Sequence, residues 1–146
     1  MTCGILCRCW ADGYDWRATE QWLNLLPHFT TCIDDVDIHF VHLRSAHPDA
    51  IPLVLTHGWP GSLLEFEQVL APLARGDRAE SFHLVCPSLP GYGFSGKPTE
   101  PGWDIHRIAR AWAVLMSRLG YDRLPRPAVT GGPAFPPASR CSIRGG

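Results

Sequence analysis

The chain has 146 residues and a mass of 16.2 kDa, which is the size of a single domain. Its 13 Lys and Arg nearly balance its 14 Asp and Glu, and a formal net charge of -1 excludes the strong positive field that nucleic-acid binding requires. Apolar stretches such as residues 51–55 end well short of the roughly 20 residues that a membrane-spanning helix needs. We therefore expect neither a nucleic-acid partner nor a membrane span.

The N-terminal residues and the cysteines indicate a reducing compartment. Residues 1–10 contain one Arg and no run of Leu or Val before a cleavage site of small residues, so no secretory signal is expected. Of the six cysteines, Cys3, Cys7 and Cys9 crowd one end and the others are scattered, which favours reduced thiols. A metal site at Cys7 and Cys9 is disfavoured because no CxxC or HxxxH pattern accompanies them. The sequence thus predicts a cytoplasmic protein without a metal site.

The first third of the chain predicts a helix followed by a β-hairpin. Apolar residues recur at helical spacing over residues 14–26, and Pro27 ends the pattern. Two strands, 29–33 and 36–43, then flank the turn at Asp34-Asp35. His39 and His42 lie in the second strand, and we interpret both as ordinary strand residues rather than ligands, because nothing nearby in the sequence completes a site.

The middle of the chain alternates strands and helices. Continuous apolar runs predict strands at 52–55 and 82–86, buried on both faces. Helices are predicted at 63–74, with Ser62 as N-cap, and at 105–119, with Asp104 as N-cap and Gly120 as terminator. Strands in this order favour parallel pairing behind the antiparallel hairpin, which is an α/β fold.

The C-terminal tail does not continue this pattern. Residues 124–146 contain five prolines and no periodicity where another buried strand is expected. An incomplete sheet leaves an apolar edge open and helix faces uncovered. We expect poor solubility or a molten state for the chain.

The segment HGWPGS, residues 57–62, carries the strongest local signal for chemistry. It follows a predicted buried strand and precedes a helix, where peptide N–H groups point into the ligand cleft of open α/β sheets. Such N–H groups can form an oxyanion hole. A simple tight turn between strand and helix is an equally good interpretation of the local pattern. Ser62 fits a helix cap better than a nucleophile, since the sequence places no base beside it.

A second glycine-rich segment, GYGFSG at residues 91–96, has the spacing of a dinucleotide-binding fingerprint but the wrong context. That fingerprint joins a strand directly to a helix, whereas prolines on both sides of this segment predict a loop. Because both glycine-rich segments follow neighbouring buried strands, we expect this loop to form the floor of a pocket beside the first.

Together, HGWPGS and the later PSLPGYGFSGKP closely resemble the epoxide hydrolase family of α/β hydrolases, in its microsomal and juvenile-hormone-like branch. The upstream DGYDWRATEQWLNLLPHFTTCIDDVDIHFVHLRS resembles the end of that branch's N-terminal extension running into the first hairpin, so the resemblance covers roughly residues 10–123. It implies three parts: the end of the extension at 1–27, a partial α/β-hydrolase core at 28–123, and an aberrant tail at 124–146.

The resemblance also implies site roles and a reaction. The oxyanion hole would use the peptide N–H of Trp59, in the loop formed by His57, Gly58, Trp59, Pro60 and Gly61. The pocket loop would be Gly91, Tyr92, Gly93, Phe94 and Ser95. In the family, an Asp on the turn after the fifth strand opens a small-molecule epoxide, and a His-activated water hydrolyses the resulting ester to a diol, without metal or organic cofactor. Tyrosines of the family's lid donate to the epoxide oxygen.

The sequence departs from the family where the nucleophile is expected. The family's Gly-Gly-Asp-Trp-Gly turn is replaced by Val129-Thr130-Gly131-Gly132, and no Asp or Glu follows Asp122. No residue matches the nucleophile, the lid, the second acid or the catalytic His, so no catalytic residue is assigned. The alternatives to an epoxide hydrolase are a non-catalytic fragment or passive interaction module and, less well supported, a haloalkane dehalogenase or similar relative. Substrate identity and oligomeric state are not determined by the sequence.

Two explanations of the departure are open, a shift of reading frame and a genuine alternative tail, and the codons are compatible with the first. Ala128 to Gly132 can be encoded by GCG GTG ACT GGG GGN, and a one-base shift of these codons reads GGT GAC TGG GGG, which is Gly-Asp-Trp-Gly. The hypothesis is a single-base insertion or deletion, or a sequencing error, near residues 123–127. The abrupt change to a proline-rich composition supports it independently.

Overall fold

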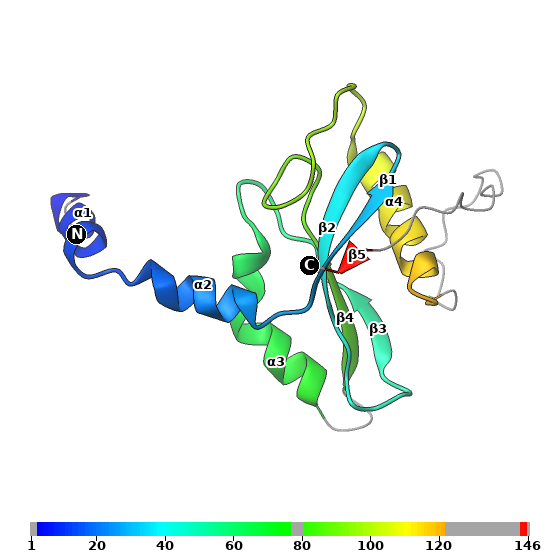
Figure 1. Ribbon diagram of the computed structural model, residues 1–146, viewed down its shortest axis with the longest axis horizontal. Coiled ribbons are helices and arrows are strands. Elements are labelled where there is room, and N and C mark those ends of the chain that lie inside the picture. The colour runs from blue at the N-terminus through cyan, green and yellow to red at the C-terminus, as the bar shows by residue number, and fades with distance from the viewer. Residues whose placement is uncertain (1–2, 77–80, 122–143, 146) are drawn as a thin grey trace.

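A mixed β-sheet forms the centre of the computed structural model, which describes residues 3–76, 81–121 and 144–145 (Figure 1). The strand order within the described residues is β3-β4-β2-β1-β5. Their bounds are β1 His28–Ile33, β2 Val36–Leu43, β3 Ile51–Val54, β4 Phe82–Pro87 and β5 Arg144–Gly145. The pair β3 and β4 is parallel and the other pairs are antiparallel. The predicted α/β fold with parallel strands behind an antiparallel hairpin is confirmed.

Helices cover both faces of the sheet (Figure 1). Their bounds are α1 Cys3–Asp12, α2 Trp16–Asn24, a 3-10 turn η1 Leu63–Phe66, α3 Glu67–Arg75 and α4 Ile105–Arg118. Helix α4 lies on one face, and α3 with the end of α2 lies on the other. Helix α1 and the start of α2 extend away from the sheet, and we call residues 3–24 the arm. No helix among the described residues is long and apolar enough to cross a membrane.

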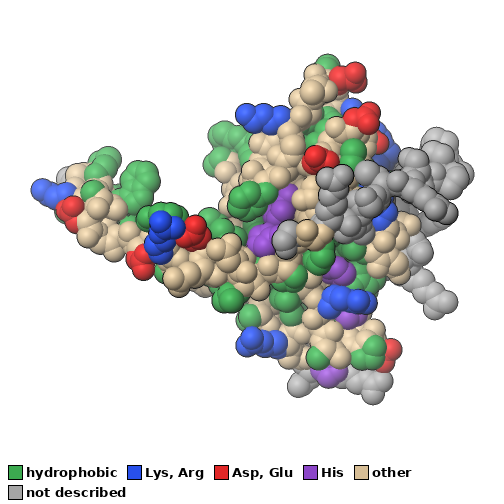
Figure 2. Space-filling model, viewed as in Figure 1, with side chains coloured by type: hydrophobic (Ala, Val, Ile, Leu, Met, Phe, Trp, Pro, Cys, Tyr) green, Lys and Arg blue, Asp and Glu red, His purple; other side chains and the backbone are tan. Residues whose placement is uncertain are grey.

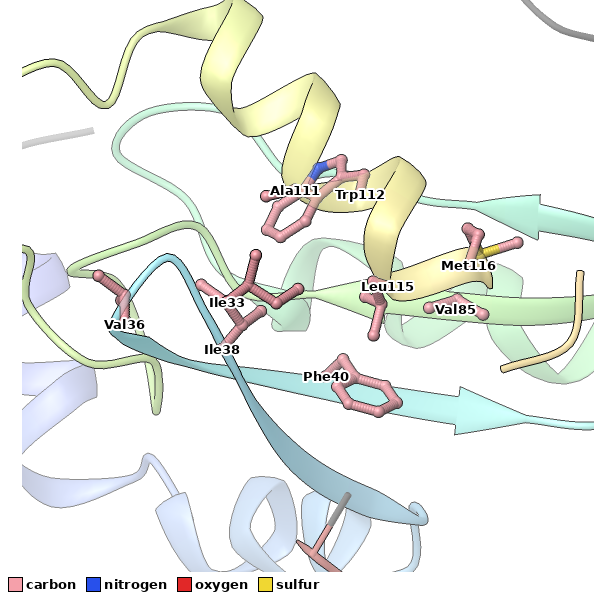
Figure 3. Packing of buried hydrophobic residues seen from close by; sticks show 9 residues of the cluster. All are labelled: Ile33, Val36, Ile38, Phe40, Val85, Ala111, Trp112, Leu115 and Met116. Atoms are coloured by element: carbon pink, nitrogen blue, oxygen red, sulfur yellow. The ribbon is translucent and has the colours of Figure 1, made fainter. Parts of the chain in front are cut away.

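Two apolar cores, one on each face, follow from the alternation of side chains along the central strands. On β2, for example, Phe40 faces α4 and Val41 faces α3. Figure 3 shows the core under α4, whose buried members are Ile33, Val36, Ile38, Phe40, Val85, Ala111, Trp112, Leu115 and Met116. The core under α3 contains Val41, Leu63, Leu70, Ala74, Leu84 and Cys86, with Trp22, Leu23 and Leu26 of the α2 region packed against it.

Local signals in the sequence are confirmed at the hairpin and at the helix ends. Asp34 and Asp35 have φ values of 50° and 61°, the left-handed conformation that a tight hairpin turn requires at both central positions. Ser62 accepts the Leu64 N–H, and Asp104 accepts the Arg107 N–H, so both predicted N-caps are present. The Ser62 hydroxyl is thus used as a cap, as expected.

Several predicted boundaries were wrong. The predicted helix 14–26 is shorter, because Asp15 caps it at Arg17 and it ends at Asn24. The predicted helix 63–74 divides into η1 and α3. Helix α1 was not predicted, and its exposed residues bury no apolar stripe that the sequence could have shown.

Strand β3 was predicted to be buried on both faces, and this was wrong. None of residues 52–55 is buried, because β3 lies at the edge of the sheet within the described residues. The N–H groups of Ile51 and Leu55 donate to Ser81 and Val85, so the alternate residue Pro52 faces away from β4. Proline has no N–H to leave unpaired there, which suits an edge position.

The predicted tail lies largely outside the described residues, so neither its aberrant character nor the frame-shift hypothesis is tested. Of residues 124–146 only the two-residue strand β5 is described, and Thr30 of β1 pairs with Arg144. The cysteines at 3, 7, 9, 32 and 86 form no disulfide in the described part of the chain, and Cys141 is outside it.

Candidate functional site

Two loops leave the carboxyl ends of neighbouring parallel strands and lie side by side. The loop that follows β3 contains residues 57–61, and the loop that follows β4 contains residues 91–96. The carboxyl edge of parallel strands is where ligands of open α/β sheets bind. The two glycine-rich loops are therefore neighbours, as the sequence predicted.

His57 ties the two loops together. Its ring is buried, with Nε2 accepting the N–H of Leu89 at 3.2 Å and Nδ1 at 3.1 Å from the carbonyl oxygen of Gly58. Since an N–H only donates and a carbonyl only accepts, the ring proton is on Nδ1. The ring also meets the Tyr92 ring edge-on, with centroids 5.8 Å apart. His57 is thus a bridge between the loops, with both ring nitrogens used.

The backbone of the first loop turns sharply at the proposed oxyanion donor. Gly61 N–H donates to Gly58 oxygen at 2.8 Å, and the peptide between Trp59 and Pro60 is cis. The Trp59 ring is 81% exposed, and its peptide N–H has no acceptor among the described residues. A peptide N–H of this kind is what an oxyanion hole needs, so the role of Trp59 stays a prediction that the geometry permits.

Helix α4 anchors the start of this loop. The indole Nε1–H of Trp112 donates to the Thr56 hydroxyl at 3.0 Å, directly before His57. The sequence contained no signal for this contact, because the two residues are 56 positions apart.

The second loop is hydrogen-bonded to strand β2 of the hairpin and to Ser88. Ser95 Oγ donates to the Ser88 carbonyl at 2.8 Å and accepts the His39 N–H at 3.0 Å. Gly96 N–H donates to the Asp37 oxygen at 2.7 Å. The loop opens no helix, in agreement with its predicted role as a loop rather than a dinucleotide fingerprint.

We expect Gly93→Ala to lower the free energy of unfolding by about 1–3 kcal/mol. Gly93 has φ of +51°, and an added Cβ would lie 3.1 Å from the Ser88 hydroxyl. The measurement is urea denaturation followed by circular dichroism. Gly58→Ala is the matched control, because a Cβ there meets nothing within 4 Å and its φ is not in the left-handed region. Equal losses in the two variants would contradict the steric argument.

An open pocket of ≈ 650 Å³ lies between the arm and the hairpin strands. Tyr14 and Trp16 line it from the arm side, and His28 and His39 line it from the strands. Figure 2 shows histidine side chains, in purple, where the arm joins the rest of the molecule. Of the predicted pocket loop, only Phe94 lines this pocket, and none of residues 57–61 does. The pocket is thus separate from the loop that carries the predicted oxyanion donor.

The histidines of β2 are more than isolated strand residues. His39 is 4% exposed, and both of its ring nitrogens are hydrogen-bonded, to His28 and to Ser88. His42 Nε2 lies 2.8 Å from the Tyr121 hydroxyl, and burial together with Arg44 and His83 lowers its pKa. The partners of His39 come from β1 and from the end of β4, and the sequence alone contained no signal for either of them.

Other nucleophile and metal candidates are disfavoured. Burial raises the pKa of the Cys86 thiol to about 12, which keeps it protonated and unreactive at neutral pH. Within the described ranges, no group of three or more His, Cys, Asp or Glu side chains is arranged to hold a metal ion.

Comparison with known families agrees with this architecture. The alpha/beta hydrolase fold profile matches residues 51–124, and the profile described as "Epoxide hydrolase N terminus" matches residues 2–66. The first of these matches covers half of the chain and defines the class of protein as an α/β hydrolase. The relatives and solved structures below narrow this class, and the chain belongs to the epoxide hydrolase family of α/β hydrolases.

The proteins that this chain resembles are much longer than it is. A protein of Stigmatella aurantiaca (strain DW4/3-1), assigned by name to the epoxide hydrolases, is 53% identical over 117 residues, which are 77% of this chain and 27% of that protein. Juvenile hormone epoxide hydrolase 2 of Ctenocephalides felis is 40% identical over 78% of this chain and 26% of its own length. This chain therefore spans about a quarter of the length of these relatives.

Solved structures show the same correspondence. The epoxide hydrolase of Aspergillus niger superposes with a TM-score of 0.67 at 43% identity, over 77% of this chain and 30% of that one. The juvenile hormone epoxide hydrolase of Bombyx mori gives a TM-score of 0.69 at 38% identity, over 77% and 31%. A haloalkane dehalogenase variant from Bradyrhizobium elkanii, at 22% identity and a TM-score of 0.52, shows the shared fold alone.

Proposed function

We propose that this chain carries the oxyanion-hole part of an epoxide hydrolase, and that a protein containing it converts an epoxide and water to a vicinal diol. The observation that carries the proposal is the loop at 57–61. Its Trp59 N–H has no acceptor among the described residues, and His57 holds the loop against the glycine-rich loop by a hydrogen bond to Leu89. Membership of the epoxide hydrolase family supports the substrate class.

The reaction balances without a metal or organic cofactor. An Asp carboxylate oxygen forms a bond to one epoxide carbon while that carbon's bond to the ring oxygen breaks, and a lid tyrosine protonates the departing oxygen. Water, deprotonated by a His, then adds to the acyl carbon of the ester. The Trp59 N–H would stabilise the negative oxygen of the tetrahedral intermediate. As that intermediate collapses, the protonated His gives its proton to the leaving alkoxide, which completes the diol. The carboxylic acid left on the Asp then returns its proton to the tyrosinate, so that both groups are restored.

We propose that this chain by itself is inactive, because no Asp or Glu follows Asp122 and no residue matches the nucleophile. The alternative function is a non-catalytic fragment or passive interaction module. Both proposals predict that this chain has no activity, so an activity assay of the chain cannot distinguish them. The sequence of the encoding gene can.

The decisive experiment is to sequence the encoding DNA from the codon of Tyr121 onward and to translate every frame. We expect a neighbouring frame to read Gly-Asp-Trp-Gly and to continue to a later acid and His. Protein made from that frame should form diol from a small epoxide such as styrene oxide, whereas the printed chain should not. A confirmed frame with nothing catalytic downstream would establish the fragment instead.

Two controls test the assigned reaction and the proposed inactivity of this chain. Halide release from a haloalkane by the frame-corrected protein, without diol formation from epoxides, would contradict the epoxide hydrolase and favour a dehalogenase. Diol formed by the purified printed chain would contradict the proposed absence of a nucleophile.

We further propose a cytoplasmic location and a role in epoxide metabolism and detoxification, since hydrolysis of a reactive epoxide yields an unreactive diol. Fractionation of source cells tests the location. Recovery of the protein in the membrane fraction would contradict it.

A further inference from the structure

A continuous line of hydrogen bonds joins the arm to the glycine-rich loop through two histidines. His28 Nε2 lies 2.8 Å from the carbonyl oxygen of Leu23 in α2, and His28 Nδ1 lies 2.8 Å from His39 Nε2. His39 Nδ1 in turn lies 2.9 Å from the Ser88 hydroxyl. We infer that His28 and His39 form a proton-sensitive latch, which holds α2 and the glycine-rich loop on the sheet while both rings are neutral and releases them when both rings are protonated.

The partners determine the position of every proton in the closed latch. The Leu23 carbonyl can only accept, so the proton of neutral His28 is on Nε2 and its Nδ1 accepts. His39 must therefore donate from Nε2, which leaves its Nδ1 to accept the Ser88 hydroxyl proton. Every nitrogen of both rings then has a hydrogen-bond partner. Each group in the line from Ser88 to Leu23 donates to the next one.

Added protons disturb this line in two steps. One proton can be accommodated on His39 Nδ1 if the Ser88 hydroxyl turns away, which gives up the bond that Ser88 donates. A second proton places an N–H on each of the two nitrogens that are 2.8 Å apart, between two positively charged rings. No reorientation of hydrogens relieves that contact, so the rings must separate.

Burial and the neighbouring His28 favour the neutral state of His39. Burial, and then the neighbouring His28, lower the pKa of His39 to about 4. The titratable groups that line the same pocket from the arm side are Tyr14 and Glu20, and Glu20 is paired with Arg17 at 2.7 Å. The partners on the glycine-rich loop side, Ser88 and Phe94, carry no charge.

Separation of the two rings would loosen both α2 and the glycine-rich loop. Leu23 packs on the core under α3, close to the end of the arm. Phe94 meets both rings edge-on, at centroid distances of 6.2 Å to His28 and 5.1 Å to His39. Ser95 accepts the His39 N–H and donates to Ser88. Release would therefore widen the pocket and loosen the loop while leaving the core under α4 intact.

The test begins with the full printed chain at neutral pH. Nitrogen-15 NMR of the histidine rings should show protons on Nε2 and none on Nδ1 in both His28 and His39. As the pH falls, hydrogen-exchange protection of the Ser95 and Gly96 amides should decrease by about a hundredfold per pH unit once two protons are taken up. The protection of the Leu115 amide in α4 should fall much less than that of the Ser95 and Gly96 amides over the same range, because α4 loses only what global stability loses.

Variants identify the groups responsible. His28→Gln or His39→Gln, which can hydrogen-bond but not titrate, should remove the pH dependence of loop protection, whereas the exposed control His106→Gln should keep it. If His39→Gln does not fold, the His28 variant and the wild-type NMR measurement still decide the matter. A proton on Nδ1 of either ring at neutral pH, loop protection independent of pH, or a fall of Leu115 protection as steep as that of Ser95 and Gly96 would each overturn the latch. The latch does not depend on the proposed hydrolysis, since none of these measurements involves an epoxide.

Discussion

Phe40→Ala is expected to lower the free energy of unfolding by about 3–5 kcal/mol. The Phe40 side chain is 0% exposed and lies at the centre of the core under α4 (Figure 3). It also stacks on its cross-strand partner Phe29, with ring centroids 5.6 Å apart. Truncation removes these contacts and leaves a cavity, because the surrounding strands and helix cannot collapse into it.

Urea denaturation of the monomer measures this change, and Leu25→Ala is the control because Leu25 is 83% exposed. A large difference between the two variants indicates a specifically packed core. The molten state expected from the incomplete sheet predicts the opposite, namely a broad transition and equally small effects. The comparison therefore decides whether two cores on one sheet suffice to fold this chain.

Acidification from pH 6.5 to pH 4 is expected to remove roughly 3 kcal/mol of stability through His39 alone. In the unfolded chain this imidazole takes up a proton near its ordinary value of 6.5, but in the folded chain its pKa is about 4. Between these values the unfolded state binds more protons than the folded state, so stability falls as the pH falls. The contribution is fully present above pH 6.5 and is lost as the pH drops through that window.

Other groups titrate nearby, so the readout is a difference between variants. The pKa of His42 is also lowered, and its protonation acts in the same direction. The free energy of unfolding should therefore decline less steeply with acid in His39→Gln than in the wild type, and His106→Gln should follow the wild type. Identical slopes in all three proteins would show that His39 titrates in the folded chain as it does in the unfolded one.

Local features of the fold could be predicted from the sequence because their signals act over a few residues. The Asp34-Asp35 turn, the Ser62 and Asp104 caps and the helix at 105–118 depend on backbone preferences and hydrogen bonds between near neighbours. The two glycine-rich loops were recognised for the same reason. Each follows a short apolar strand, and parallel strands bring their carboxyl ends to one edge of the sheet.

The site partners could not be predicted, because they depend on which strands become neighbours. His28 and His39 meet only because β1 and β2 pair, and Ser88 reaches His39 only because β4 pairs with β2. The exposure of Ile51 likewise follows from the edge position of β3 rather than from its apolar sequence. Strand order is a property of the whole sheet, and no short window of sequence contains it.

By itself, the sequence determined the α/β class, the positions of the strands and caps, and the resemblance that led to the epoxide hydrolase family. The tertiary structure alone decided that His57 bridges the two loops, that Trp112 anchors the first of them, and that two histidines link the arm to the second. The reason is physical. Capping and periodicity are short-range effects, whereas a buried hydrogen bond between distant residues forms only when the packed sheet brings its donor and acceptor together and excludes water from both.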